Sequence, residues 1–151
     1  MMFKTHLAFS LFIGLILIKI LNIKNQILFL ILLLFFAIFP DIDEKTSKIS
    51  KKIKFLSYPI NLIFRHRGFF HTIYLPLILF LLFFIVNKIL GVAILAGYLS
   101  HLFLDSLTKS GIRAFKPFKL KFYGVFKSGG FFDYFLFLLF LLIDIYLIIN
   151  L

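Results

Sequence analysis

The side chains that could hold a metal ion are few, because the 151-residue chain contains four His, six acidic residues and no Cys. Without Cys, disulfides, thiolate ligands and thiol nucleophiles are excluded. His101 and Asp105 are the most informative pair. Their i, i+4 spacing places them on one face of a helix, within an apolar stretch where polar groups are costly and usually functional. A hydrogen bond that joins two packed helices is the alternative explanation for the pair.

The elements that must position these residues are apolar helices. Hydrophobic residues make up 62% of the chain and the mean hydropathy is +1.09, whereas soluble domains are about 45–50% apolar. A spanning helix needs about 20 mostly apolar residues. We therefore expect one integral membrane domain over residues 1–151, an all-α polytopic membrane helix bundle. Its five predicted spans cover residues 5–21, 26–39, 69–86, 90–107 and 131–151.

The basic residues predict how the bundle is oriented. The formal net charge is +11, and most Lys and Arg fall in two connectors, at residues 45–67 and 108–130. By the positive-inside rule, the N-terminus and both connectors face the cytoplasm and the chain makes five crossings of the inner (plasma) membrane. Connector 45–67 has the pattern of an interfacial amphipathic segment. We expect this charge to meet anionic lipid headgroups rather than nucleic acid.

This topology brings several polar residues to one membrane depth, at the inner ends of four helices. Taken singly, His6, Asp41, Asp43 or His66 could simply cap a helix or meet headgroups. Together they predict a divalent metal site, with Zn most expected and Mn or Fe as alternatives. Two ions bridged by a carboxylate would suit phosphoester hydrolysis. The candidate ligands are His6, Asp41, His66, His71, His101 and Asp105, and the spacing leaves open whether His66 or His71 binds directly.

Four further residues have a predicted or an open role. Arg67 could clamp a phosphate through its planar guanidinium, or be one more positive-inside charge. Asp41 or Asp43 could act as a general base. Asp133 lies where an acid favours a helix N-terminus, and Asp144 has no obvious partner.

Four motifs together resemble a known family. They are T-H at residues 5–6, P-D-I-D at 40–43, H-R-G-F-F-H-T at 66–72 and G-Y-L-S-H-L-F-L-D-S-L-T-K-S-G-I-R-A-F-K-P-F at 97–118. The chain resembles the YdjM family, described as LexA-regulated, membrane-bound, metal-dependent hydrolases, over roughly residues 6–118. The resemblance implies an inner-membrane protein with metal-dependent hydrolase activity.

A more distant similarity is to the zinc-dependent phospholipase C and P1 nuclease group. Those all-helical trinuclear zinc enzymes carry an H-x-x-x-D ligand pair, which His101 and Asp105 match. The further His and Glu ligands that this group has later in its chain are missing after Asp105, so one or two metals are expected here.

The predicted function is that of a membrane-bound, metal-dependent hydrolase. Its substrate would be a lipid-borne or small phosphoester at the cytoplasmic face of the membrane. The alternative is a non-enzymatic metal-binding membrane protein, such as a sensor, a carrier or a structural partner. The clustering of polar residues at one face disfavours a carrier, because no polar path crosses the predicted spans.

Overall fold

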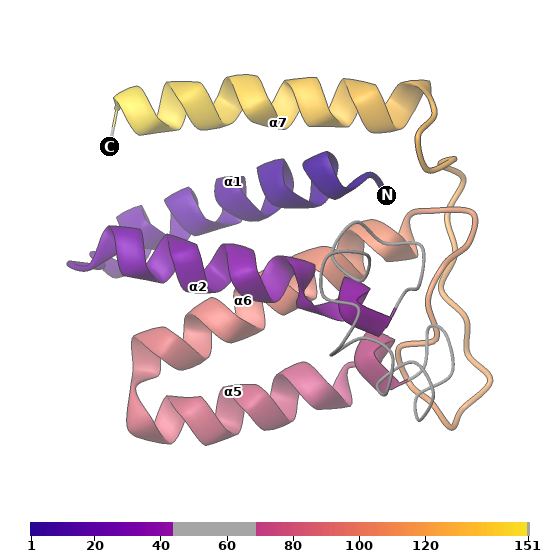
Figure 1. The fold of residues 1–151 in the computed structure, drawn as a ribbon, viewed down its shortest axis with the longest axis horizontal. Coiled ribbons are helices and arrows are strands. Elements are labelled where there is room, and N and C mark those ends of the chain that lie inside the picture. The colour runs from indigo at the N-terminus through magenta and orange to yellow at the C-terminus, as the bar shows by residue number, and fades with distance from the viewer. Residues whose placement is uncertain (44–68, 151) are drawn as a thin grey trace.

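The structure, a computed structural model, describes residues 1–43 and 69–150, and every regular element in this part is helical (Figure 1). The chain is an all-α helical membrane bundle, as predicted. The expected interfacial segment at residues 45–67 lies outside the described residues. The elements are α1 (Phe3–Leu21), α2 (Gln26–Ile38), η1 (Phe39–Asp43), η2 (Phe69–His71), α5 (Tyr74–Val86), α6 (Lys88–Ser106) and α7 (Phe131–Ile149).

Local sequence signals explain where the helices begin and end. Helix α1 is followed by Asn22 in a left-handed conformation (φ 50°), which Asn tolerates better than most residues. The side chain of Asn87 caps α6 by accepting hydrogen bonds from two backbone N–H groups of its first turn. After α2 the chain tightens into the 3₁₀ helix η1, which contains Pro40.

The third predicted span was wrong at its N-terminal end. Residues 69–71 form the separate 3₁₀ helix η2, and α5 begins only at Tyr74. A helix that began at residue 69 would hold Pro76 in its interior, where the ring clashes with the carbonyl one turn earlier. With α5 beginning at Tyr74, Pro76 falls in the first turn, where proline is tolerated.

The helices differ in how far they can reach across a bilayer. Helices α1, α6 and α7 have 19 residues each and are long and apolar enough to span a membrane. Helices α2 and α5 have 13 residues each, or about 20 Å at 1.5 Å per residue, against a hydrocarbon thickness of about 30 Å. All five predicted apolar helices are therefore present, while the number of crossings stays a prediction.

Helix α6 lies at the centre of the bundle and packs against α1, α2 and α5, while α7 packs on α1. The backbones of α6 and α2 approach each other closely. A Cβ atom added at Gly97 would overlap the carbonyl oxygen of Leu33 and approach the backbone of Ala37. Small residues at such crossings are typical of membrane helix packing. The outward faces remain apolar, with Ile85 86% exposed and Ile149 77% exposed.

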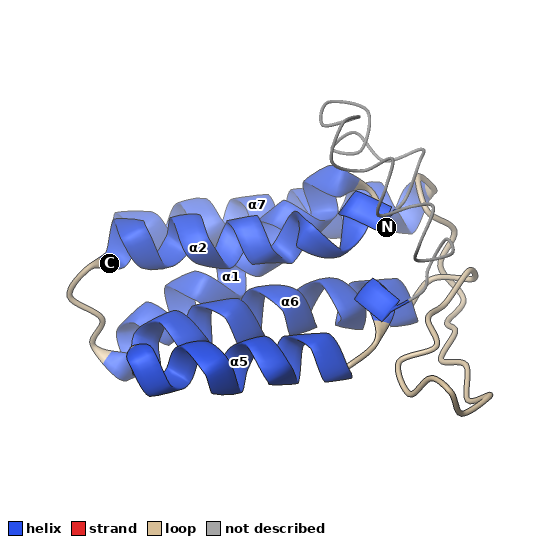
Figure 2. Cartoon of the chain, turned by 60° about the horizontal axis from the view of Figure 1, so that its bottom comes forward, coloured by secondary structure: helices blue, strands red, loops and turns tan. Residues whose placement is uncertain are grey.

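The two ends of the bundle differ in chemistry (Figures 1 and 2). One end holds the N-terminus, η1, η2, the end of α6 and the connector between α6 and α7. That connector is irregular, with two isolated bridges between Thr108 and Phe126 and between Ile112 and Phe122. The opposite end holds the turn between α1 and α2, the turn before α6, and the C-terminal end of α7. The candidate polar residues therefore lie at one end of the molecule.

Candidate metal centre

Five of the predicted ligands come together at the connector end of the bundle. His6 lies on α1, Asp41 on η1, His71 on η2, and His101 and Asp105 on α6. The three imidazoles are at most 2% exposed and Asp105 is 5% exposed, whereas Asp41 is only partly buried. Four elements far apart in sequence thus build one buried cluster.

The spacing of the donor atoms suits a metal ion. The His101 Nε2 atom lies 3.5 Å from Asp41 Oδ1 and 3.7 Å from Asp105 Oδ2. Asp105 Oδ2 is 3.8 Å from His71 Nε2, and Asp105 Oδ1 is 3.2 Å from His6 Nε2. Two ligands that bind one tetrahedral Zn²⁺ at about 2.0–2.2 Å lie roughly 3.4 Å from each other. The donor set and its distances therefore fit a divalent ion.

The orientation of His101 is fixed from outside the cluster. Its Nδ1 lies 2.7 Å from the carbonyl oxygen of Ala37 on α2. A carbonyl can only accept, so Nδ1 carries the hydrogen and Nε2 is directed toward the carboxylates of Asp41 and Asp105. That Nε2 is buried and makes no hydrogen bond within the described part of the chain. A metal-binding His almost always donates its other ring N–H in this way.

The imidazole rings pack directly on one another. His6 stacks on His101 with ring centroids 4.0 Å apart and an interplanar angle of 12°, and His71 meets His101 edge-on. The stacking brings the Nε2 atoms of His6 and His101 to the same carboxylate, that of Asp105. The amino nitrogen of Met1 also donates to Asp105 Oδ1, at 2.7 Å.

The ligands fall into two groups that overlap at His101. One group is His6, His101 and Asp105, and the other is Asp41, His71 and His101. Because Nδ1 of His101 is bonded to Ala37, only its Nε2 can bind an ion. His101 could therefore bind at most one ion, and a second ion would have to use the other residues of the two groups.

The remaining sequence-predicted residues are not placed in the cluster. His66 and Arg67 lie outside the described residues, and the side chain of Asp43 in η1 is likewise not described. Their roles stay predictions. Sequence reasoning missed the carbonyl of Ala37, and a backbone group leaves no sequence signal. It noted Asp133 only as a helix N-terminal acid, although the position of that residue at the same predicted depth was a usable signal.

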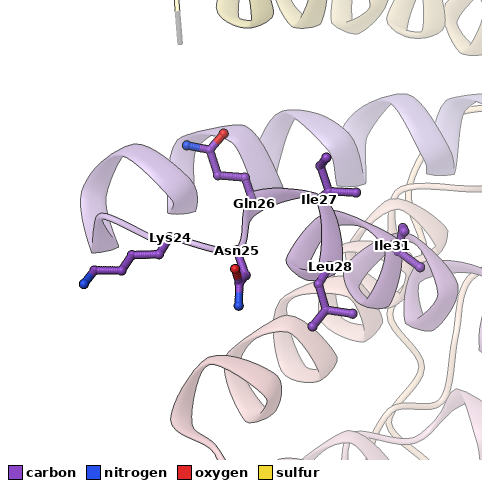
Figure 3. A pocket seen from close by; sticks show the side chains of 6 residues that line it. All are labelled: Lys24, Asn25, Gln26, Ile27, Leu28 and Ile31. Carbon is purple, nitrogen blue, oxygen red and sulfur yellow. The ribbon is translucent and has the colours of Figure 1, made fainter.

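A pocket at the opposite end of the bundle has different chemistry (Figure 3). Lys24, Asn25, Gln26, Ile27, Leu28 and Ile31 line it. None of these residues has an imidazole or a carboxylate, so this pocket lacks the two ligand types of the candidate centre. The candidate centre is therefore at the connector end.

The apolar exterior, the spanning helices and the buried polar cluster define an integral membrane protein. The chain belongs to the YdjM inner membrane protein family, whose model matches residues 1–150.

Individual relatives are similar over part of their length. An uncharacterized protein of Bacillus subtilis (strain 168), YvsG, is 36% identical over 83 residues, covering 54% of this chain and 52% of the relative. Inner membrane protein YdjM of Escherichia coli (strain K12) is 31% identical over 95 residues, covering 57% of this chain and 47% of the relative. The YdjM protein of Shigella flexneri matches to the same extent. The chain spans about half the length of these relatives, and no solved structure matches it.

Proposed function

We propose that this protein is a membrane-bound, metal-dependent hydrolase that cleaves a phosphoester of a lipid-like substrate at the cytoplasmic face of the membrane. One observation carries the proposal. The buried Nε2 of His101 is aimed by the Ala37 carbonyl at two carboxylates and makes no hydrogen bond within the described residues. An unsatisfied polar atom at such a position is costly, and a metal ion would satisfy it.

The ligand set of the proposal is His6, Asp41, His71, His101 and Asp105, holding one or two divalent ions. Zn²⁺ is preferred for this mixture of imidazole and carboxylate, with Mn²⁺ or Fe²⁺ as alternatives. When bound, the metal supplies Lewis acidity that activates water and stabilises charge on a phosphoryl oxygen.

The chain's own residues supply the other parts of the reaction. Asp41 is the most exposed member of the cluster, so its carboxylate can reach a water at the edge of the centre and accept its proton. Asp43 is the alternative base, and Arg67 is the proposed phosphate clamp. The remaining ligands are buried and hold the metal in place.

The surroundings of the cluster support a lipid-borne substrate. The connector between α6 and α7 contains six basic residues and no acidic residue between Ser106 and Phe132. It also exposes large apolar side chains, including Tyr123 (71% exposed) and Val125 (75% exposed). Basic and apolar side chains together suit the headgroup region of an anionic membrane. The centre therefore lies where a lipid phosphate would be within reach.

A non-enzymatic metal-binding protein is the second candidate, because the three imidazoles are nearly inaccessible. Closed sites of this kind are typical of structural metals, whereas catalytic sites keep an open position. Within this alternative a sensor or a structural partner fits better than a carrier. The described ligands lie at one end of the bundle and do not line a path through it.

Turnover of lipid phosphoesters separates the two candidates. We expect the detergent-purified protein, loaded with Zn²⁺ or Mn²⁺, to release phosphate or headgroup from phosphatidic acid or phosphatidylglycerol in mixed micelles. Asp41→Asn should lower the rate by about 10²-fold or more, in line with loss of a general base, while metal remains bound through the other ligands. Bound metal without turnover on any lipid phosphoester would contradict the hydrolase and favour the second candidate.

A further inference from the structure

Asp133 lies at the connector end of α7 and is fully buried. Its carboxylate accepts three hydrogen bonds from two other segments. Oδ1 accepts the hydroxyl of Thr5 at 2.6 Å, and Oδ2 accepts the backbone N–H groups of Met2 at 2.9 Å and Gly129 at 2.8 Å. Hydrogen bonds to an ionised group are about twice as strong as neutral ones, and more so in a buried setting. Asp133 therefore firmly joins the start of α7 to the start of α1.

The hydrogen bonds that join Asp133 to the start of α1, here called the Asp133 joint, include one from Thr5. Thr5 immediately precedes the candidate ligand His6. Thr5 and His6 are consecutive, and consecutive side chains on a helix point about 100° apart. Thr5 thus faces Asp133 on α7, while His6 faces α6, where its Nε2 lies 3.2 Å from Asp105 and its ring stacks on His101. Fixing the Thr5 side chain fixes the rotation of the first turn of α1, and with it the direction of His6.

The next side-chain hydrogen bond from α1 to another helix is more than one turn away. Ser10 meets Ser100 of α6 at 2.6 Å between their hydroxyl oxygens. This contact holds the middle of α1, and the ring of Phe9 packs against Phe103 and Phe140. Within the first turn, the Thr5 hydroxyl makes the hydrogen bond that joins α1 to α7. Helix ends fray when their terminal groups are not held, so loss of the joint would free His6 more than any residue deeper in the helix.

We propose that Asp133 is a positioning residue of the metal centre, which acts through the Thr5 hydroxyl to hold His6 in ligand geometry. This inference rests on the metal centre of the proposed function. It gives α7, which supplies none of the described candidate ligands, a part in building the site. Supporting residues of this kind typically change metal affinity by about 10- to 100-fold when they are removed.

A purely structural role for Asp133 makes a different prediction. Its bond to the Gly129 N–H closes the turn that precedes α7 and would matter for folding alone. Thr5→Val removes only the hydroxyl and leaves the bonds of Asp133 to Gly129 and Met2 in place. Thr5→Ser keeps the hydroxyl and should restore whatever Thr5→Val loses. This pair of variants therefore separates the link to His6 from the turn that precedes α7.

The test uses the full chain in detergent, stripped with a chelator, titrated with Co²⁺ by absorption and then with competing Zn²⁺. We expect Thr5→Val and Asp133→Asn to weaken Zn²⁺ binding by about 10- to 100-fold and to alter the Co²⁺ absorption spectrum, with Thr5→Ser close to wild type. Asp144→Asn, which changes the other buried carboxyl of α7, is the matched control and should leave both readouts unchanged.

Two results would overturn the inference, and they can be told apart by whether the wild type still binds metal. Wild-type affinity and an unaltered Co²⁺ spectrum in Thr5→Val would overturn the positioning role while leaving the metal centre intact. No binding of Co²⁺ or Zn²⁺ by the wild type would overturn the metal centre, and the positioning role with it. If Asp133→Asn fails to fold, the Thr5→Val and Thr5→Ser pair still decides the question.

Discussion

At the scale of single residues, the buried carboxylates of this bundle differ in whether they have polar partners. Asp105 lies among imidazole nitrogens, and Asp133 accepts three hydrogen bonds. Asp144, in the apolar part of α7, is 1% exposed and neither of its oxygens is hydrogen-bonded within the described residues. An isolated carboxyl in such a place lowers stability. We infer that the first two residues serve the centre and that Asp144 does not.

We therefore predict that Asp144→Leu stabilises the protein. An Asp near the middle of a membrane helix costs about 2.5–3.5 kcal/mol relative to water on insertion scales. Because Asp144 lies in the second half of α7, we expect a gain of about 1–3 kcal/mol in the free energy of unfolding. Unfolding in a denaturing detergent titration measures it, and the metal content should not change. A loss of stability in this variant would contradict the prediction and would show that the Asp144 carboxyl has a polar partner.

The sequence predicted part of the site at this scale. The i, i+4 spacing of His101 and Asp105 is a local property, so the shared face could be predicted. The sequence could not show whether His66 or His71 is the direct ligand, because both residues precede the same apolar helix. The Ala37 carbonyl and the link from Thr5 to Asp133 depend on how helices pack, and helix packing leaves no local pattern.

At the scale of elements, the contact between α2 and α6 aligns the centre. Gly97 lets the two backbones meet at Leu33, and one turn further along each helix Ala37 meets His101. The same crossing therefore sets both the packing and the direction of the His101 ring. The sequence predicted the helices from their apolar runs. It did not predict this crossing, because the small residues of α6 could face any neighbour.

Gly97→Ala should disturb the centre through this crossing. The added Cβ would overlap backbone, which cannot move without separating the helices. We expect a loss of about 1–3 kcal/mol in stability from overpacking and weaker Zn²⁺ binding by about tenfold or more, as for loss of a supporting hydrogen bond.

Gly14→Ala is the matched control for that variant. Its new Cβ meets the flexible side-chain end of Leu30, at 2.7 Å, which can shift. Zn²⁺ binding, measured by competition titration, should stay near wild type. Equal losses of affinity in the two variants would contradict a specific role for the α2–α6 crossing.

At the scale of the whole molecule, most of the described basic residues and the candidate metal centre lie at the same end of the bundle. The α6–α7 connector and Lys4 hold most of the described basic residues, and the metal ligands lie beside them. Lys19, Lys24 and Lys88 lie at the opposite end. The positive-inside rule then predicts that the centre faces the cytoplasm. The sequence predicted this arrangement, because it follows from the order of apolar runs and charged connectors.

Single-cysteine labelling tests that orientation directly, because the chain contains no Cys. We expect Lys121→Cys, in the connector, to react with a membrane-impermeant maleimide only after the cells are permeabilised. Lys24→Cys, at the opposite turn, should react in intact spheroplasts. Both side chains are exposed in the structure. The reverse pattern would place the centre on the outer face and exclude a substrate in the cytoplasmic leaflet.

The central claim is that the buried imidazoles and carboxylates bind a metal, and elemental analysis of detergent-purified protein tests it most directly. The comparison is wild type against the double variant His101→Ala and Asp105→Ala, with both shown to be inserted in the membrane. We predict roughly one or two transition-metal ions per wild-type chain and their loss in the variant. A wild type that holds no metal after incubation with Zn²⁺ or Mn²⁺, or a variant that holds as much as the wild type, would contradict the account.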